Sequence, residues 1–170
     1  MAAPSYSRCF TFASVAATVI AFALSPSLGG AQGTQVQLTV TGGPLTFGAP
    51  TAADLTVGKL ESTTALTYQA ETSAEPTGGT HTTTVYIRSS VSTLGGGKAV
   101  ADLEWRRADD ATWHALTTSD VAVQSRTDSF SLQGHTWSNS IYFRVALHWT
   151  GDPPATYTGN LVLTVSATQP

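Results

Sequence analysis

Apolar and polar residues alternate along most of the chain after residue 31, which is the pattern of half-buried β-strands. The clearest run is 140–149, where Ile141, Phe143, Val145, Leu147 and Trp149 all fall on one face. A slip of one residue in the pairing of this strand would turn all five side chains into water. Residues 140–149 are therefore expected to form a central strand that faces the core.

Shorter alternating runs, bounded by Gly, Pro and other turn-forming residues, predict further strands. No later stretch repeats apolar residues convincingly at helical spacing, so no helix is expected. The additional strands are expected within 36–40, 45–47, 55–57, 66–68, 83–87, 121–123, 130–132 and 161–165. The segments 71–80 and 94–98 contain clustered Gly or Pro and are expected to be loops.

Residues 99–116 predict a β-hairpin. Its turn is expected at 108–111, where two aspartates occupy positions that suit turn geometry. A symmetric turn pairs Trp105 with His114 and Arg106 with Trp113. It also places Leu103, Trp105 and Leu116 together on one face.

Many short strands without helical crossovers indicate a mainly antiparallel sandwich or barrel. Neither an internal repeat nor a second domain is evident. The sequence thus predicts an all-β fold with one domain over residues 32–170.

The first 31 residues have the pattern of a secretory signal peptide. Arg8 precedes an apolar stretch at 9–24, and small residues follow up to Ala31. Cleavage is expected after Ala31, with a cut after Gly33 as the alternative. Cys9 is the only cysteine, so the processed chain would form no disulfide. We therefore expect an exported protein that works in the periplasm, at the cell surface or outside the cell.

Charge and hydropathy exclude two classes of partner. The net charge is −3 and charged residues make up 11% of the chain, well below the usual quarter. A mildly acidic chain with scattered cations lacks the basic footprint of a nucleic-acid-binding protein. No second apolar segment is long enough to span a bilayer. We expect neither nucleic acid nor a membrane span after removal of the leader.

Both ends of the domain resemble a known family. Residues 36–41 (VQLTVT) with 44–48 (PLTFG), and the ending 155–165 (ATYTGNLVLTV), are similar to the first and last strands of pilin-type secreted sandwiches of the spore coat protein U kind. The resemblance implies an immunoglobulin-like β-sandwich and a role in a surface or fimbrial assembly.

The usual signatures of catalysis and cofactor binding are missing. There is no Gly-x-Ser-x-Gly elbow, and the glycines before Lys98 lack the spacing and the following helix of a phosphate loop. The four histidines, at 81, 114, 135 and 148, are not spaced as paired zinc ligands. The acidic pairs at 102/104 and 109/110 come with no partner that completes a hydrolase or calcium site. We expect no enzyme activity, no cofactor and no metal.

The remaining candidates are aromatic. Trp113, Trp137, Tyr142 and Tyr157 are expected to be partly exposed, and rings on a sheet face can stack on sugars or contact proteins. Arg144 beside Tyr142 would add a polar contact. In the alternative interpretation the rings cover the sandwich, with Arg106 stacked on Trp113 as a cation–π pair.

Two functions from different classes follow. The first is a non-catalytic structural or adhesive subunit of the cell envelope, whose partners are copies of itself or other exported proteins. Segment 34–41 could then complete a neighbour's sheet or pair within its own sandwich. The second is a module that binds glycans or another ligand.

Overall fold

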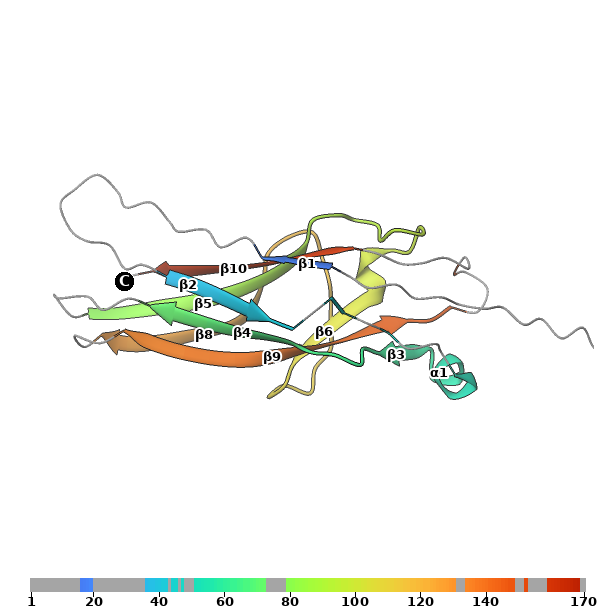
Figure 1. Ribbon diagram of the computed structural model, residues 1–170, viewed down its shortest axis with the longest axis horizontal. Coiled ribbons are helices and arrows are strands. Elements are labelled where there is room, and N and C mark those ends of the chain that lie inside the picture. Colours follow the sequence, from blue (N-terminus) through green and yellow to red (C-terminus); the bar gives the residue numbers. More distant parts are fainter. Residues whose placement is uncertain are drawn as a thin grey trace, which may run out of the picture.

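The computed structural model describes residues 16–19, 36–42, 44–45, 47, 51–72, 79–130, 134–148, 152 and 159–168. Two β-sheets pack together, and Figure 1 shows their strands running along the long axis of the molecule. This confirms the expected all-β sandwich.

The first sheet has four strands. Their order is β1 (Ala16–Val19), β10 (Asn160–Thr168), β5 (Gly79–Ser89) and β8 (Val121–Phe130). β10 and β8 both pair antiparallel with β5, whereas β1 runs parallel to β10. β1 and β8 are thus the edge strands of this sheet.

The second sheet has six strands, all paired antiparallel. β2 (Val36–Thr41), β4 (Leu66–Thr72), β9 (His135–Ala146), β6 (Leu103–Arg107) and β7 (His114–Ala115) lie in that order. β3 (Lys59–Glu61) also pairs with β9, beyond the end of β4. Segment 34–41, considered above as a strand donor, thus contributes β2 to its own sandwich through residues 36–41.

The core lies between the sheets and follows the predicted alternation. Ile141 and Phe143 of β9 are fully buried, and Val145 and Leu147 are buried beside them. The bounds of this strand differ from the expected 140–149, since β9 begins at His135 and ends at Ala146. Trp149 lies outside the described residues. From the other sheet, Val85 and Ile87 of β5 and Leu161 and Leu163 of β10 join the same apolar cluster.

The 99–116 hairpin has the predicted register. Trp105 pairs with His114, and the amide of Leu116 donates to the carbonyl of Leu103 at 2.8 Å. Leu103, Trp105 and Leu116 are each at most 2% exposed, as their shared face requires. A short 3₁₀ helix, η1 (Val100–Asp102), precedes β6.

The expectation of a strand at 55–57, and of no helix, was wrong. Residues Ala52–Val57 form α1, which lies at one end of the sandwich (Figure 1). A capping box starts the helix, since the Thr51 hydroxyl accepts from the Asp54 amide and the Asp54 carboxylate accepts from the Thr51 amide. Gly58, at φ 72°, ends it in the left-handed conformation.

Other boundaries also differ from those expected. Of the expected strand at 45–47, the structure describes Leu45 and Phe47; both are buried, and Phe47 forms an isolated β-bridge with Ser62. The segments 121–123 and 130 belong to one strand, β8, while 131–132 lie outside the described residues. Residues 71–72 and 79–80 of the expected loop belong to β4 and β5.

The outward face of the first sheet carries paired hydroxyl groups. Thr82 lies 2.8 Å from Thr127, and Thr84 lies 2.9 Å from Ser125, each pair joined by a hydrogen bond between β5 and β8. On β8 an ion pair between Arg126 and Asp128 at 3.0 Å adds opposite charges to the edge strand. Charge on an edge strand discourages further pairing there.

β1 lies within the segment that the sequence predicts to be a removable leader. Its register with β10 runs from Ala16 opposite Asn160 to Val19 opposite Leu163. The leader and the 31/32 boundary stay predictions. In the part of the chain that the structure describes, no helix is long and apolar enough to cross a bilayer.

Candidate recognition surface

Three of the residues expected to mark a recognition surface or cover the sheet meet at the outward face of β6 and β9: Tyr142 and Arg144 from β9, and Trp113 from the chain that precedes β7. Trp105 and Phe143 point into the core, so their chain neighbours face outward. Cross-strand pairing then sets Arg106 opposite Tyr142 and Glu104 opposite Arg144.

Trp113, from the connection before β7, packs on both of these arginines. The guanidinium carbon of Arg144 lies 4.3 Å from the Trp113 ring centre, and that of Arg106 lies 5.1 Å away. Arg106 is also 5.0 Å from the Tyr142 ring. We call Arg106, Trp113, Tyr142 and Arg144 the outer aromatic cluster. The Arg106–Trp113 cation–π pair of the alternative interpretation is thus confirmed.

Glu104 fixes one side of this cluster. Its carboxylate accepts from Arg144 at 2.5 Å and from Lys59 at 3.0 Å. Burial alone would raise the pKa of Glu104, but the hydrogen bonds from Arg144 and Lys59 outweigh it and hold that pKa below its usual value. Arg144 is therefore held between a carboxylate and an aromatic ring, while Tyr142 remains 40% exposed.

Trp137 does not belong to this surface. It is 7% exposed and its ring meets Tyr68 edge to face, with 5.8 Å between ring centres and 86° between planes. The expectation that Trp137 would be partly exposed was wrong, because its position on β9 has the same parity as Ile141 and Phe143. Tyr157 lies outside the described residues.

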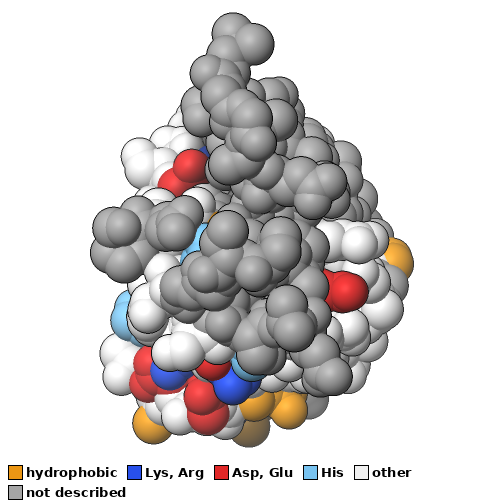
Figure 2. Space-filling model, turned by 90° about the vertical axis from the view of Figure 1, so that its left-hand side faces the viewer, with side chains coloured by type: hydrophobic (Ala, Val, Ile, Leu, Met, Phe, Trp, Pro, Cys, Tyr) orange, Lys and Arg blue, Asp and Glu red, His pale blue; other side chains and the backbone are white. Residues whose placement is uncertain are grey.

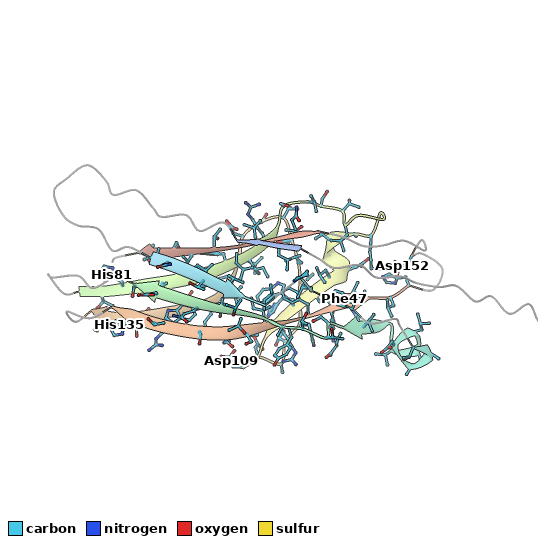
Figure 3. All side chains as sticks on the ribbon, viewed as in Figure 1. Phe47, His81, Asp109, His135 and Asp152 are labelled. Atoms are coloured by element: carbon cyan, nitrogen blue, oxygen red, sulfur yellow. The ribbon has the colours of Figure 1, made fainter. Side chains whose placement is uncertain are left out.

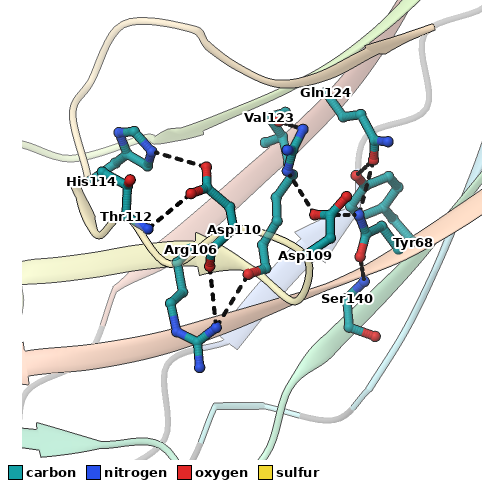
Figure 4. Close-up of polar contacts among 11 residues, drawn as sticks. Tyr68, Arg106, Asp109, Asp110, Thr112, His114, Val123, Gln124 and Ser140 are labelled. Atoms are coloured by element: carbon teal, nitrogen blue, oxygen red, sulfur yellow. Dashed lines mark hydrogen bonds and ion pairs between the residues drawn. The ribbon is translucent and has the colours of Figure 1, made fainter.

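The aspartates of the 108–111 turn serve the fold (Figure 4). Asp109 pairs with Arg107 at 3.0 Å and accepts from the side-chain amide of Asn139 on β9. Asp110 accepts from the amide of Thr112 at 2.9 Å, and this hydrogen bond is the main reason that the pKa of Asp110 lies below its usual value. The Asp109 carboxylate thus links the turn to β9, and the Asp110 carboxylate stabilises the chain that follows the turn.

A polar bridge joins the two sheets beside this turn. The Tyr68 hydroxyl of β4 donates to Gln124 of β8 at 2.7 Å, and Asn139 donates to the same oxygen at 3.1 Å (Figure 4). Burial raises the pKa of Tyr68 far above its usual value, with a smaller opposing effect from Arg107. The hydroxyl therefore stays protonated and continues to donate.

The histidines do not converge on one site. His81 and His135 lie at one end of the sandwich, whereas Asp152 lies at the other (Figure 3). His114 stacks near Trp105 with 4.9 Å between ring centres, and His148 lies 3.6 Å from Asp102. Among the described residues, no group of three or more His, Cys, Asp or Glu could hold a metal ion.

One polar cluster was missed by sequence analysis. The side chain of Lys98 is fully buried and pairs with Asp152 and Asp102, although the segment 94–98 reads only as a glycine-rich loop. The sequence does not indicate that Lys98 and Asp152 meet, because 54 positions separate them.

Charged side chains of both signs lie close together at one end of the molecule. Figure 2 shows this end, where acidic and basic side chains lie interspersed near the lower edge. The chain matches no model of a known protein family and no curated protein.

Proposed function

We propose that this protein is an exported, non-catalytic structural or adhesive subunit of the cell envelope, and that strand addition at β10 joins it to a second copy. The proposal rests on the predicted leader, the sandwich fold and the resemblance of residues 36–48 and 155–165 to pilin-type subunits. The proposed role depends on an exposed sheet edge and requires no reactive centre.

The observation that carries the proposal is the pairing of β1 with β10. β1 supplies the edge beside β10, yet residues 16–19 lie in the predicted leader. Cleavage after Ala31 would remove this strand and leave the main-chain groups of that edge unpaired. Such an edge pairs readily with another extended chain.

The lengths of β1 and β10 also support strand addition at β10. β1 has four residues and β10 has nine, so among the described residues Thr164–Thr168 have no paired strand on that side, although β2 of the other sheet contacts β10. The opposite edge of the sheet carries the Arg126–Asp128 ion pair, which disfavours pairing there. β10 is thus the better acceptor of the two edges.

The test starts with export of the full-length chain in a bacterial host. The intact mass of the exported protein gives the cleavage site. Light scattering after size exclusion and electron microscopy then give its state of association. We expect a chain that begins near residue 32 and forms oligomers or fibres.

A peptide with the sequence of residues 14–21 provides the matched competitor. It should bind the processed protein and suppress association, because it restores the missing edge strand. The same peptide with Pro in place of both Ala17 and Thr18 should have much less effect, because neighbouring amides of a strand point to opposite sides and one of the two must face β10. A processed protein that stays monomeric and ignores the first peptide would refute the proposal, as would an exported chain that retains residues 16–19.

A second function is favoured by the exposure of Tyr142. Its ring is 40% exposed on a sheet face beside Arg106, an arrangement that suits stacking on a sugar. Binding of a glycan should change Trp113 fluorescence, and Tyr142→Ala should abolish the change. The control is Tyr86→Ala on the other sheet, which should leave it intact. A flat response across a broad glycan panel would exclude this function.

A further inference from the structure

Lys98 is the most unusual charged residue that the structure describes. Its side chain is fully buried at the end of a tight turn, in which the Leu94 amide donates to the Lys98 carbonyl at 2.7 Å. The Nζ atom lies 2.5 Å from Oδ1 of Asp152 and 3.3 Å from Oδ2 of Asp102. The side chain of Asp152 is only 9% exposed and that of Asp102 is 27% exposed.

The Asp152 carboxyl group is held in place from both sides. Its Oδ2 accepts from the His148 amide at 2.8 Å, while its Oδ1 faces Lys98. The Asp152 amide donates to the His148 carbonyl at 3.1 Å, which closes the turn that carries the carboxyl group. The amine and the carboxyl carbon therefore approach each other in a fixed orientation.

Burial favours the loss of both charges. An ammonium and a carboxylate withdrawn from water retain a large desolvation penalty even when they are paired. A neutral amide would avoid that penalty, and a buried site also keeps bulk water away from the new bond. We propose that Lys98 and Asp152 condense to form an intramolecular isopeptide bond.

The reaction needs no reagent beyond these side chains. Within the ion pair one proton moves from Nζ to Oδ1 of Asp152. The Nζ lone pair then attacks Cγ, and the negative charge that develops on Oδ2 faces the His148 amide, which donates to it. Asp102 accepts a second proton from Nζ and passes it to Oδ1, which leaves as water. The Nζ–Cγ bond forms, the Cγ–Oδ1 bond breaks, and nothing is oxidised or reduced.

The bond would close a covalent loop around much of the sandwich. Residues 98 and 152 flank β6, β7, β8 and β9, so these four strands would lie inside the ring. The only cysteine, Cys9, lies in the predicted leader, which leaves the processed chain no disulfide. An isopeptide bond would supply the covalent cross-link that disulfide bonds often provide in exported proteins.

The decisive measurement is the intact mass of the exported protein from the full-length chain, fresh and after ageing. We expect a mass lower by one water molecule than the sequence from the observed N-terminus requires. Fragmentation should yield a branched peptide that joins residues 98 and 152. Lys59 and Glu104 serve as an internal control, because this half-buried pair, at 3.0 Å, should stay unlinked.

Three variants distinguish the isopeptide bond from other reactions that lose water. Lys98→Arg keeps the charge but supplies no nucleophilic amine, and Asp102→Asn removes the proton carrier; both should show the full mass. Lys59→Arg, the matched control, should keep the loss. A succinimide at another aspartate would also lose water, but it would persist in Lys98→Arg. Asp152 itself cannot form one, because the following residue, Pro153, has no amide hydrogen.

A wild-type protein at full mass, or a loss of water that survives Lys98→Arg, would overturn this inference. The mass is read from a denatured chain, so Lys98→Arg is informative even if the variant folds poorly. The result is also independent of the proposed assembly, because a monomer can carry the bond and a fibre can lack it.

Discussion

Replacing Phe143 by Ala tests whether the sandwich depends on the core face of β9. Phe143 is fully buried on the central strand of its sheet, and its cross-strand partner is the buried Trp105. The neighbouring Tyr142 lies on the opposite face of the same strand and is 40% exposed. Two aromatic residues adjacent in sequence therefore form a matched pair that differs mainly in burial.

The expected loss follows from the buried area. A buried aromatic side chain removes about 150–250 Å² from water, which at about 25 cal/mol per Å² corresponds to roughly 4–6 kcal/mol. Since Ala retains part of this surface, we expect Phe143→Ala to lower the free energy of unfolding by about 4 kcal/mol, within the usual range of about 3–5 kcal/mol. Tyr142→Ala loses mainly a surface cation–π contact with Arg106, worth about 0.5–1 kcal/mol.

Urea unfolding of the exported protein, followed by tryptophan fluorescence, measures both changes. With a denaturant slope of about 2 kcal/mol per M, the midpoint of Phe143→Ala should fall by about 2 M and that of Tyr142→Ala by less than about 0.5 M. If Phe143→Ala does not fold, Phe143→Leu should show a smaller shift in the same direction. Equal midpoints for the two sites, or a larger shift for Tyr142, would refute the assignment of the core face.

Three further substitutions probe local features. Glu104→Gln should lower the unfolding midpoint at neutral pH. The difference from wild type should shrink as the pH falls below about 4.3, because a carboxyl with a lowered folded-state pKa stabilises fully above its unfolded-state pKa and loses that contribution as the pH falls through its folded-state pKa; a difference independent of pH would contradict this. Gly42→Ala should destabilise more than Gly97→Ala in thermal unfolding, since both glycines have positive φ but only at Gly42 would a Cβ atom meet a backbone oxygen, at 2.7 Å; equal melting temperatures would show that the close approach is relaxed. Thr51→Ala should speed amide hydrogen exchange in α1 and lower helix stability by about 1 kcal/mol, whereas unchanged exchange would show that the capping box is dispensable.

The alternation of residues predicted the core positions of β2, β4, β5, β9 and β10, but it did not predict β3. In β9 a strict period of two identified the buried face, because a sheet with one face in a core leaves no other register for large apolar side chains. The hairpin register also followed from sequence, since Asp109 and Asp110 mark the centre of the connection between its two strands. The outward Arg106–Trp113 contact came from the same register.

The failures have equally specific causes. α1 was missed because six residues are too few to show a helical period, although Thr51 and Asp54 have the spacing of a capping box. Trp137 was taken for a surface ring because the predicted strand began at residue 140, whereas β9 begins five residues earlier. Lys98 was unpredictable, since its burial depends on an aspartate 54 positions away.

The hydroxyl pairs on the outer face of β5 and β8 have a consequence for the surroundings of the protein. Threonine and serine hydroxyls neither gain nor lose a proton in the pH range where proteins stay folded, and they carry no charge for salt to screen. Thr84 is buried, so hydration concerns the other three hydroxyls, and that of Thr82, Ser125 and Thr127 should be much the same in acid or alkali, and in fresh water or brine. Along these hydroxyl pairs, the wetting of the protein surface should not depend on the pH or the salt concentration of the medium.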